Sequence, residues 1–176
     1  IGFVGLGRIV RKIAELSKTF NMNFFAVVRN LREEDNVDEL YTLDGLEKVL
    51  KVSDYVVVCL PLTKETYHLF DYEKFNKMKP TAYFINIGRG KVVNEQDLIK
   101  ILKENVISGA GLDVFEEEPL PETSELWNLE NVIITPHYSG WTPYYMNRVV
   151  DIFCENLRAF LGNRKMPNLI DKERGY

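Results

Sequence analysis

An unbroken apolar run, YVVVCL at Tyr55–Leu60, is the feature that most restricts how this chain folds. A strand that is apolar at every position is buried on both faces, as in parallel sheets that carry helices on both sides. Similar runs of strand length alternate along the chain with segments in which apolar residues recur at helical spacing. This alternation predicts βαβ units and a doubly wound parallel sheet of the Rossmann-type α/β class.

The expected strands are Ile1–Gly5, Phe24–Val28, Tyr55–Leu60, 82–87, 106–114 and 132–135. The expected helices follow the first strand as far as Phe20 and lie at 44–54, 73–78, 94–105 and 142–161. Helical spacing predicts that the first helix turns five residues toward the sheet: Ile9, Val10, Ile13, Ala14 and Ser17. Asn94 is expected to cap the helix at 94–105. His68 is expected on a short helix, in a surface or packing role.

Composition excludes several classes of protein. The net charge is −4 and basic residues form no stripe, which argues against nucleic-acid binding because phosphate affinity comes mostly from Lys and Arg. No apolar run reaches the roughly 20 residues that span a bilayer, so no membrane partner is expected. The cysteines, Cys59 and Cys154, are expected to be reduced, buried thiols in a reducing, cytoplasmic compartment. No metal site is expected. Because the chain begins with Ile1, inside an expected strand, we also expect it to be a piece of a longer polypeptide.

Glycines cluster at the end of the first strand, in GFVGLGRIV. Gly5 permits a tight turn, and Gly7 lets the backbone approach a pyrophosphate held by the amide groups that open the next helix. Val10 stands where a third glycine usually allows close packing of helix on strand. We therefore expect the helix to be displaced slightly outward without loss of phosphate donors. A glycine-rich turn with no ligand is the alternative.

The end of the second strand, VVRNLREED, indicates which dinucleotide is bound. An acidic residue there binds the ribose hydroxyls of NAD, whereas an arginine suits the 2′-phosphate of NADP. Arg29 and Asn30 occupy this position, Arg32 follows, and Glu33–Asp35 are expected to face water. The sequence thus favours NADP over NAD. The alternative is that both arginines lie in a solvated loop.

Polar side chains also follow three expected strands at their carboxyl ends, where open parallel sheets bind ligands. Arg89 lies in INIGRG, Glu118 in GLDVFEEEP and His137 in VIITPHYSGWT. A guanidinium holds a carboxylate through two hydrogen bonds, and a protonated imidazole gives a proton to an oxygen as hydride reaches the adjoining carbon. A carboxylate beside that imidazole favours its charged form. Such a set suits the reduction of a 2-oxo acid.

Five segments resemble, in this order, the nucleotide-binding domain of the D-isomer-specific 2-hydroxyacid dehydrogenases: GFVGLGRI, VVVCLPLTKETYHLF, INIGRGKVVNEQDLIKIL, GAGLDVFEEEPLP and ITPHYSGWT. The resemblance covers nearly the whole chain. It implies an NAD(P)-dependent oxidoreductase that transfers hydride between nicotinamide and C2 of a small 2-oxo or D-2-hydroxy acid, such as glyoxylate or hydroxypyruvate. Because family members usually dimerise through this domain, it also implies a homodimer.

The resemblance implies roles for individual residues as well. Arg89 orients the substrate carboxylate, His137 donates the proton, and Glu118, directly before a proline, is the partner of the histidine. Glu116 and Glu117 are then expected to form a solvated acidic face. The expected cofactor-binding set, which includes the glycines and strand-end residues named above, is Gly5, Gly7, Arg8, Ile9, Arg29, Asn30, Leu60, Pro61, Thr66, Ile87, Gly88 and Asp113. Asp113 is expected to face the carboxamide of the nicotinamide.

In this family the dinucleotide domain is inserted into a separate substrate domain. We therefore expect residues 1–141 to form the dinucleotide-binding domain. Residues 142–176 are expected to be a crossover helix and tail that return to a substrate domain not present in this chain. Trp141 and Tyr144–Tyr145 either line the substrate cleft or a subunit contact, or simply pack on the crossover helix.

Two other classes of protein remain as alternatives. Transcriptional corepressors that sense NAD(H) share the fold and the same three residues, and turnover of glyoxylate or hydroxypyruvate separates an enzyme from them. A methyltransferase with a similar glycine turn would carry an acidic residue at the end of the second strand and would lack the Arg/Glu/His set, so it fits the sequence poorly.

Overall fold

The computed structural model describes residues 1–173, which divide into two compact units. The first unit is Ile1–His137, and the second begins at Tyr138. The strands are β1 (Gly2–Val4), β2 (Phe25–Val27), β3 (Glu39–Tyr41), β4 (Tyr55–Val58), β5 (Tyr83–Asn86), β6 (Gly109–Leu112) and β7 (Val132–Ile134). The α-helices are α1 (Arg8–Ser17), α2 (Leu46–Val52), α3 (Tyr72–Phe75), α4 (Glu95–Lys103) and α5 (Tyr145–Leu161).

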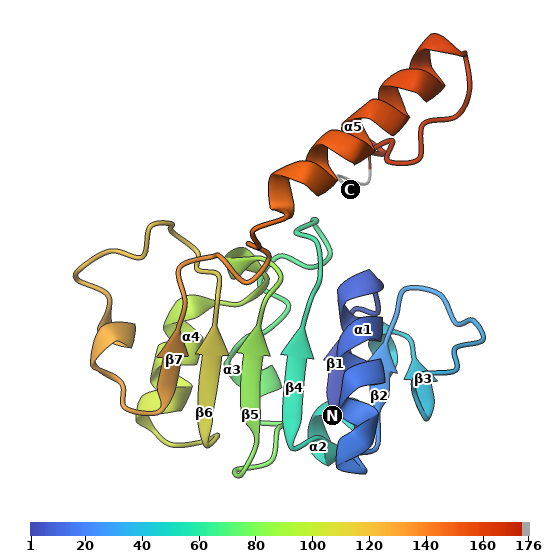
Figure 1. Cartoon of the computed structure of the whole chain (residues 1–176). Helices are drawn as coiled ribbons and strands as arrows, with labels where there is room; N and C mark the ends of the chain where they lie inside the picture. The colour runs from blue at the N-terminus through green and yellow to red at the C-terminus, as the bar shows by residue number, and fades with distance from the viewer. Residues whose placement is uncertain (174–176) are drawn as a thin grey trace. The chain divides into compact units, whose positions relative to one another are not determined.

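The first unit is built on a seven-stranded parallel sheet in the order β3-β2-β1-β4-β5-β6-β7 (Figure 1). The order reverses between β1 and β4, as in doubly wound folds. The sequence-based prediction of a Rossmann-type sheet is therefore confirmed. The prediction missed β3, which has only three residues, lies at the edge of the sheet and is not fully buried.

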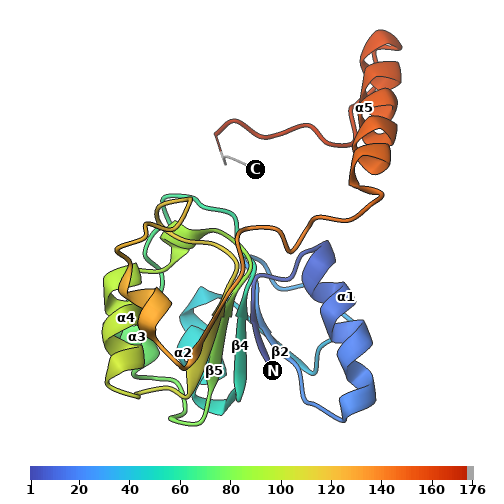
Figure 2. The same cartoon turned by 60° about the vertical axis from the view of Figure 1, so that its left-hand side comes forward.

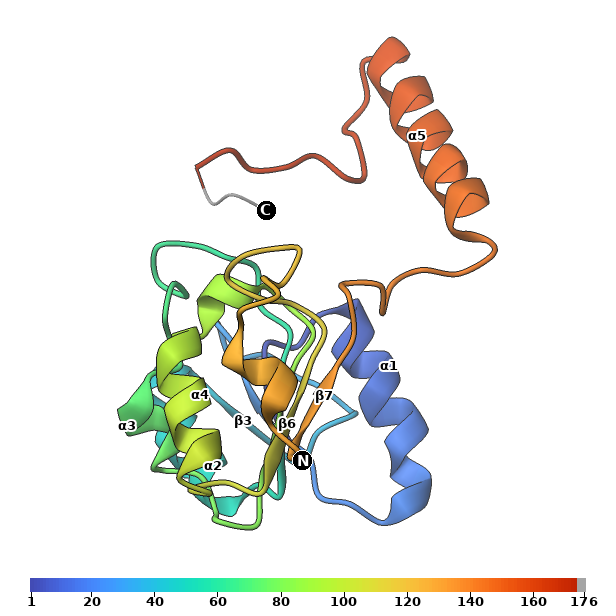
Figure 3. The same ribbon diagram turned by 90° about the vertical axis from the view of Figure 1, so that its left-hand side faces the viewer.

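Helices cover both faces of the sheet, with α1 on one side and α2, α3 and α4 on the other (Figures 2 and 3). The larger core, on the side of α4, contains the aromatic cluster Phe70, Phe75 and Phe84, with ring centroids 5.0–5.9 Å apart. The smaller core includes Val10 and Ala14 of α1, both fully buried. Burial of these apolar side chains fixes the two helical layers on the sheet.

Three expectations about burial are wrong. Ile9 is 60% exposed, because Val10 and Ala14, four positions apart, face the sheet and Ile9 lies to one side of them. Tyr55 is 40% exposed at the start of β4, where its ring stacks on Tyr83. Cys59 and Cys154 are free thiols, as expected, but both are only half-buried.

Helix α4 confirms the expected cap, since the side chain of Asn94 accepts a hydrogen bond from the backbone N–H of Asp97 at 3.2 Å. The helix starts directly after the loop that follows β5. In that loop, a β-carbon on Gly90 would lie 1.8 Å from the carbonyl oxygen of Phe115 in the loop after β6. Only glycine allows the two loops to come this close.

The second unit contains α5, which begins at Tyr145, three residues later than Thr142, where the sequence predicted it to begin. Its apolar residues at helical spacing are all exposed, from 40% to 66%; they are Val149, Val150, Phe153, Leu157 and Phe160. No helix within residues 1–173 is long and apolar enough to cross a membrane. The assignment of this segment to a substrate domain stays a prediction.

Replacing Gly90 by alanine (Gly90→Ala) is expected to lower the free energy of unfolding by about 3 kcal/mol, because the added carbon forces two backbone segments apart. Urea unfolding followed by circular dichroism measures the change. Gly111→Ala is the matched control, since a β-carbon there meets only Ile85 Cγ1 at 3.8 Å. Equal stability of the two variants would contradict this account of the loop contact.

Candidate active site

The expected site residues lie in the loops that leave the carboxyl ends of the strands, at one edge of the sheet (Figure 1). Because all the strands are parallel, these loops gather at the same edge although they are far apart in the sequence. The expected catalytic residues come from three of them. Arg89 follows β5, Glu118 follows β6 and His137 follows β7.

Glu118 and His137 are in direct contact. Glu118 Oε2 lies 2.6 Å from Nδ1 of His137, a distance typical of a hydrogen bond to a charged group. The other carboxylate oxygen, Oε1, accepts a hydrogen bond from the backbone N–H of Phe115 at 3.0 Å. His137 has a φ of +51°, a left-handed conformation that is uncommon outside glycine and is often found at functional sites.

The surroundings of Glu118 favour its charged form. Partial burial raises the pKa of this carboxyl, but the hydrogen bonds from His137 and the Phe115 N–H, with the positive charges of His137 and Arg89, hold it below its usual value. Glu118 therefore stays a carboxylate at neutral pH. A carboxylate is the form that supports an imidazolium beside it.

Arg89 is held by the loop that carries it. Its Nη1 donates to the carbonyl of Gly88 at 2.7 Å. The buried side chain of Asn86 donates to the Arg89 carbonyl at 3.2 Å and accepts from the Gly88 N–H at 3.0 Å. The sequence analysis missed Asn86. Its signal was a lone amide inside the apolar strand AYFINI.

The glycine turn after β1 fits a dinucleotide. Gly5 has a φ of +95°, and a β-carbon on it would lie 2.7 Å from the carbonyl oxygen of Cys59. Gly7, by contrast, has no neighbour within 4 Å of such a carbon, so the space beside the backbone is open to a phosphate. The first turn of α1 has no acidic residue and no side-chain cap. Its backbone N–H groups, starting with those of Arg8 and Ile9, are suited to bind an anion.

Other expected cofactor residues lie in the segments that follow β4, β5 and β6. Leu60, Pro61, Thr66 and Ile87 are half-buried, and a β-carbon on Gly88 would lie 2.9 Å from the backbone of Leu60. The Thr66 hydroxyl donates to the Pro61 carbonyl at 2.7 Å, which fixes the loop after β4. Buried Asp113 accepts a hydrogen bond from Thr135 Oγ1 at 2.5 Å.

One expectation about the residues after β2 is wrong. Arg29 and Asn30 are exposed, and Arg29 Nη2 lies 3.9 Å from Glu65 Oε2. The exposure expected for Glu33–Asp35 is wrong for Glu34, whose side chain is only 8% exposed. Two arginines bind it.

The two arginines that bind Glu34 are Arg11 and Arg32. Arg11 Nε donates to both of its carboxylate oxygens at 3.0 and 3.1 Å, and Arg32 Nε lies 3.5 Å away. Arg32 Nη2 also donates to the Leu6 carbonyl in the glycine turn, at 2.9 Å. This ion-paired group ties the loop after β2 to α1 and to the turn.

Two further expectations fail in the loops after β4 and β6. His68 lies in a turn, with a φ of +48°, and not on a helix. Glu116 is not part of a solvated face. Its side chain is 31% exposed, contacts His68 and accepts a hydrogen bond from the Glu95 backbone. Glu117 is exposed, as expected.

The fold and this edge of the sheet define a dinucleotide-binding domain with a carboxylate–histidine pair. Residues 1–139 match the family model described as the D-isomer specific 2-hydroxyacid dehydrogenase, NAD binding domain. The chain belongs to this family.

Named relatives agree with the match. A glyoxylate reductase of Pyrococcus horikoshii is 44% identical over 98% of this chain, and one of Pyrococcus furiosus is 45% identical over 98%. The chain spans about half the length of these relatives, 52% and 51%. A crystal structure of a D-isomer specific 2-hydroxyacid dehydrogenase from Xanthobacter autotrophicus Py2, in complex with NADPH and MES, superimposes with a TM-score of 0.93 at 35% identity. The superposition covers all of this chain and 72% of the Xanthobacter chain.

Removal of the imidazole in His137→Ala is expected to raise the pKa of Glu118, because the variant loses both a hydrogen bond and a nearby positive charge. Arg89→Ala is expected to raise it less, since the charge of Arg89 has the smallest effect on this pKa and no hydrogen bond is lost. Carbon-13 NMR of the Glu118 carboxyl over a pH titration measures both effects. A Glu118 titration that is the same in wild type and His137→Ala would contradict the assigned contact.

Proposed function

We propose that this chain is the coenzyme-binding part of an NAD(P)-dependent D-2-hydroxyacid dehydrogenase. Glyoxylate, hydroxypyruvate or a similar small 2-oxo acid is the proposed substrate. The observation that carries the proposal is the 2.6 Å contact between Glu118 and His137 at the edge of the sheet where Arg89 also lies. The glyoxylate reductases named above support it, as does a similar NADPH-dependent glyoxylate/hydroxypyruvate reductase of Sinorhizobium meliloti, with 30% identity and a TM-score of 0.91.

Each of the three side chains has a distinct role in the proposed reaction. Arg89 binds the substrate carboxylate and thereby fixes the direction of the carbonyl. His137 gives its proton to the carbonyl oxygen, and Glu118 holds the imidazole in the orientation and charge state that this transfer needs. A bound reduced nicotinamide supplies the hydride that reaches C2. In the reverse direction His137 takes the proton from the hydroxyl.

NADP is the preferred cofactor in this proposal. Arg29 lies at the end of β2, where an arginine suits a 2′-phosphate. The open space at Gly7 and the uncapped start of α1 suit the pyrophosphate. Asp113 is proposed to face the carboxamide of the nicotinamide.

The rest of the proposal concerns the intact protein. Residues 1–141 form the dinucleotide-binding domain, and residues 142–176 return to a substrate domain that supplies the other wall of the cleft. The protein acts as a homodimer in a reducing, cytoplasmic compartment, which the two free cysteines support.

In the intact polypeptide, Arg89→Ala and His137→Ala are each expected to lower kcat/KM for the oxo acid by about 100-fold or more, because each removes a group that acts in the transition state. Dinucleotide affinity is expected to stay at the wild-type level. Steady-state assays with glyoxylate and hydroxypyruvate, with cofactor fluorescence titration, measure the two quantities. Glu117→Gln, which changes an exposed neighbour of the site, is the control. Full turnover by both variants would refute the proposed function.

The preference for NADP predicts that Arg29→Ala weakens NADPH binding about tenfold or more, since a charge-assisted contact with the 2′-phosphate is lost. NADH binding is expected to stay the same. Titration of this chain with both dinucleotides, followed by nicotinamide fluorescence, gives the two affinities. Lys12→Ala removes an exposed positive charge from α1 and is the control. Tighter binding of NADH than of NADPH by the wild type would overturn the preference.

A further inference from the structure

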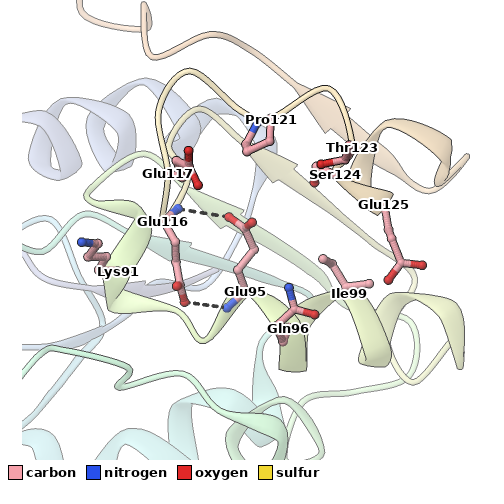
Figure 4. A pocket seen from close by; sticks show the side chains of 10 residues that line it. All are labelled: Lys91, Glu95, Gln96, Ile99, Glu116, Glu117, Pro121, Thr123, Ser124 and Glu125. Atoms are coloured by element: carbon pink, nitrogen blue, oxygen red, sulfur yellow. Dashed lines mark hydrogen bonds between the residues drawn. The ribbon is translucent and has the colours of Figure 1, made fainter.

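The carboxylate of Glu116 joins parts of three loops that carry site residues. Its Oε1 accepts a hydrogen bond from the backbone N–H of Glu95, at the start of α4, at 3.0 Å. In return, Oε2 of Glu95 accepts from the Glu116 N–H, also at 3.0 Å (Figure 4). The same Oε1 lies 2.9 Å from Nε2 of His68, in the loop after β4.

His68 is suited to offset the negative charge at this point. Burial raises the pKa of Glu95, and the charges of Glu116 and Glu117 raise it further, against the hydrogen bond from the Glu116 N–H that lowers it. The Nε2 atom of His68 is itself buried, and its ring stacks on Tyr67 with centroids 4.0 Å apart. Nε2 lies within hydrogen-bond distance of Glu116, although its N–H is not aligned with the acceptor, and the contact becomes an ion pair when the ring is protonated.

This contact is continuous with the carboxylate–histidine pair. Glu116 follows Phe115 directly, and the Phe115 N–H holds the oxygen of Glu118 that does not face His137. The backbone of Phe115 and Glu116 also packs on Gly90, next to Arg89. A shift of Glu116 therefore moves the backbone donor that orients Glu118.

We propose that Glu116 and His68 are positioning residues for the proposed reaction, and that their contact keeps Glu118 on His137. This inference rests on the proposed function, because it assigns Glu118 and His137 their roles. Neither side chain belongs to the expected catalytic or cofactor-binding set. They act through the loop between β6 and Pro119, which they connect to the loop after β4 and to the start of α4.

The neighbouring acid offers a matched comparison. Glu117 has the same charge and lies one residue away, yet it is exposed, and Figure 4 draws hydrogen bonds from Glu95 to Glu116 but none to Glu117. If the acidic character of the loop alone mattered, the two positions would be equivalent. If the contact matters, only Glu116 affects Glu118.

The test uses the intact polypeptide with the variants Glu116→Ala, His68→Leu, His68→Gln and the control Glu117→Ala. Glu116→Ala and His68→Leu are expected to lower kcat about tenfold or more and to leave the KM for the dinucleotide unchanged, because the acid–histidine pair is displaced and the cofactor contacts are not. In both variants Glu118 is expected to move away from His137, so its pKa rises. The acidic limb of the pH–rate profile then moves to higher pH. His68→Gln keeps a donor near Nε2 and is expected to restore part of kcat.

Carbon-13 NMR of the Glu118 carboxyl, recorded on this chain without substrate, gives the same answer independently of turnover. A Glu118 titration that is unchanged in Glu116→Ala and His68→Leu would overturn the inference, whatever their activity. Should Glu116→Ala fail to fold, His68→Leu, which leaves Glu116 and its hydrogen bond from the Glu95 N–H in place, decides alone. A wild-type rate in His137→Ala would instead refute the proposed function and leave the NMR result to stand by itself.

Discussion

Backbone contact between the loops after β4, β5 and β6 is the constraint on which the site depends. Gly88 lies against the backbone of Leu60, and Gly90 lies against Phe115, at distances that a β-carbon on either residue would prevent. The sheet brings the strand ends to one edge, but it does not set their loops in register. These two glycines do, and they thereby place Arg89 beside the loop of Glu118. The segment INIGRG therefore needs glycine at these two positions, because a side chain at either one would prevent the loops from meeting.

Electrostatic pairing then fixes what packing leaves adjustable. Acidic side chains at the edge of the sheet face basic groups from other loops: Glu118 faces His137, Glu116 faces His68 and Glu34 faces two arginines. Partly buried pairs of this kind add little net stability, but removing one partner leaves a charge in a poor environment. Their contribution is geometric. Each pair ties one loop of the edge to a neighbouring loop or helix.

The sequence was sufficient to predict the elements with a strong local pattern. Val56–Val58 and the period of α4 report burial directly, and Asn94 marks a helix start by its own chemistry. The sequence also indicated the strand-end positions of Arg89, Glu118 and His137, because strand ends can be located once the strands are known. The geometry between those side chains lies in loops and has no periodic signal.

The errors at the acidic runs and at His68 share one physical cause, since each concerns a side chain whose environment is set by residues distant in the chain. Acidic runs such as REED and EEE look solvated, and a pattern of charge cannot show that Glu34 meets Arg11 or that Glu116 meets the start of α4. His68 was expected on a short helix, whereas its backbone N–H donates to the Lys91 carbonyl and its φ is positive. In each case a long-range contact overrode a local preference. The same contacts connect the loops of the site, so the residues that were hardest to interpret from the sequence are the ones that hold its parts together.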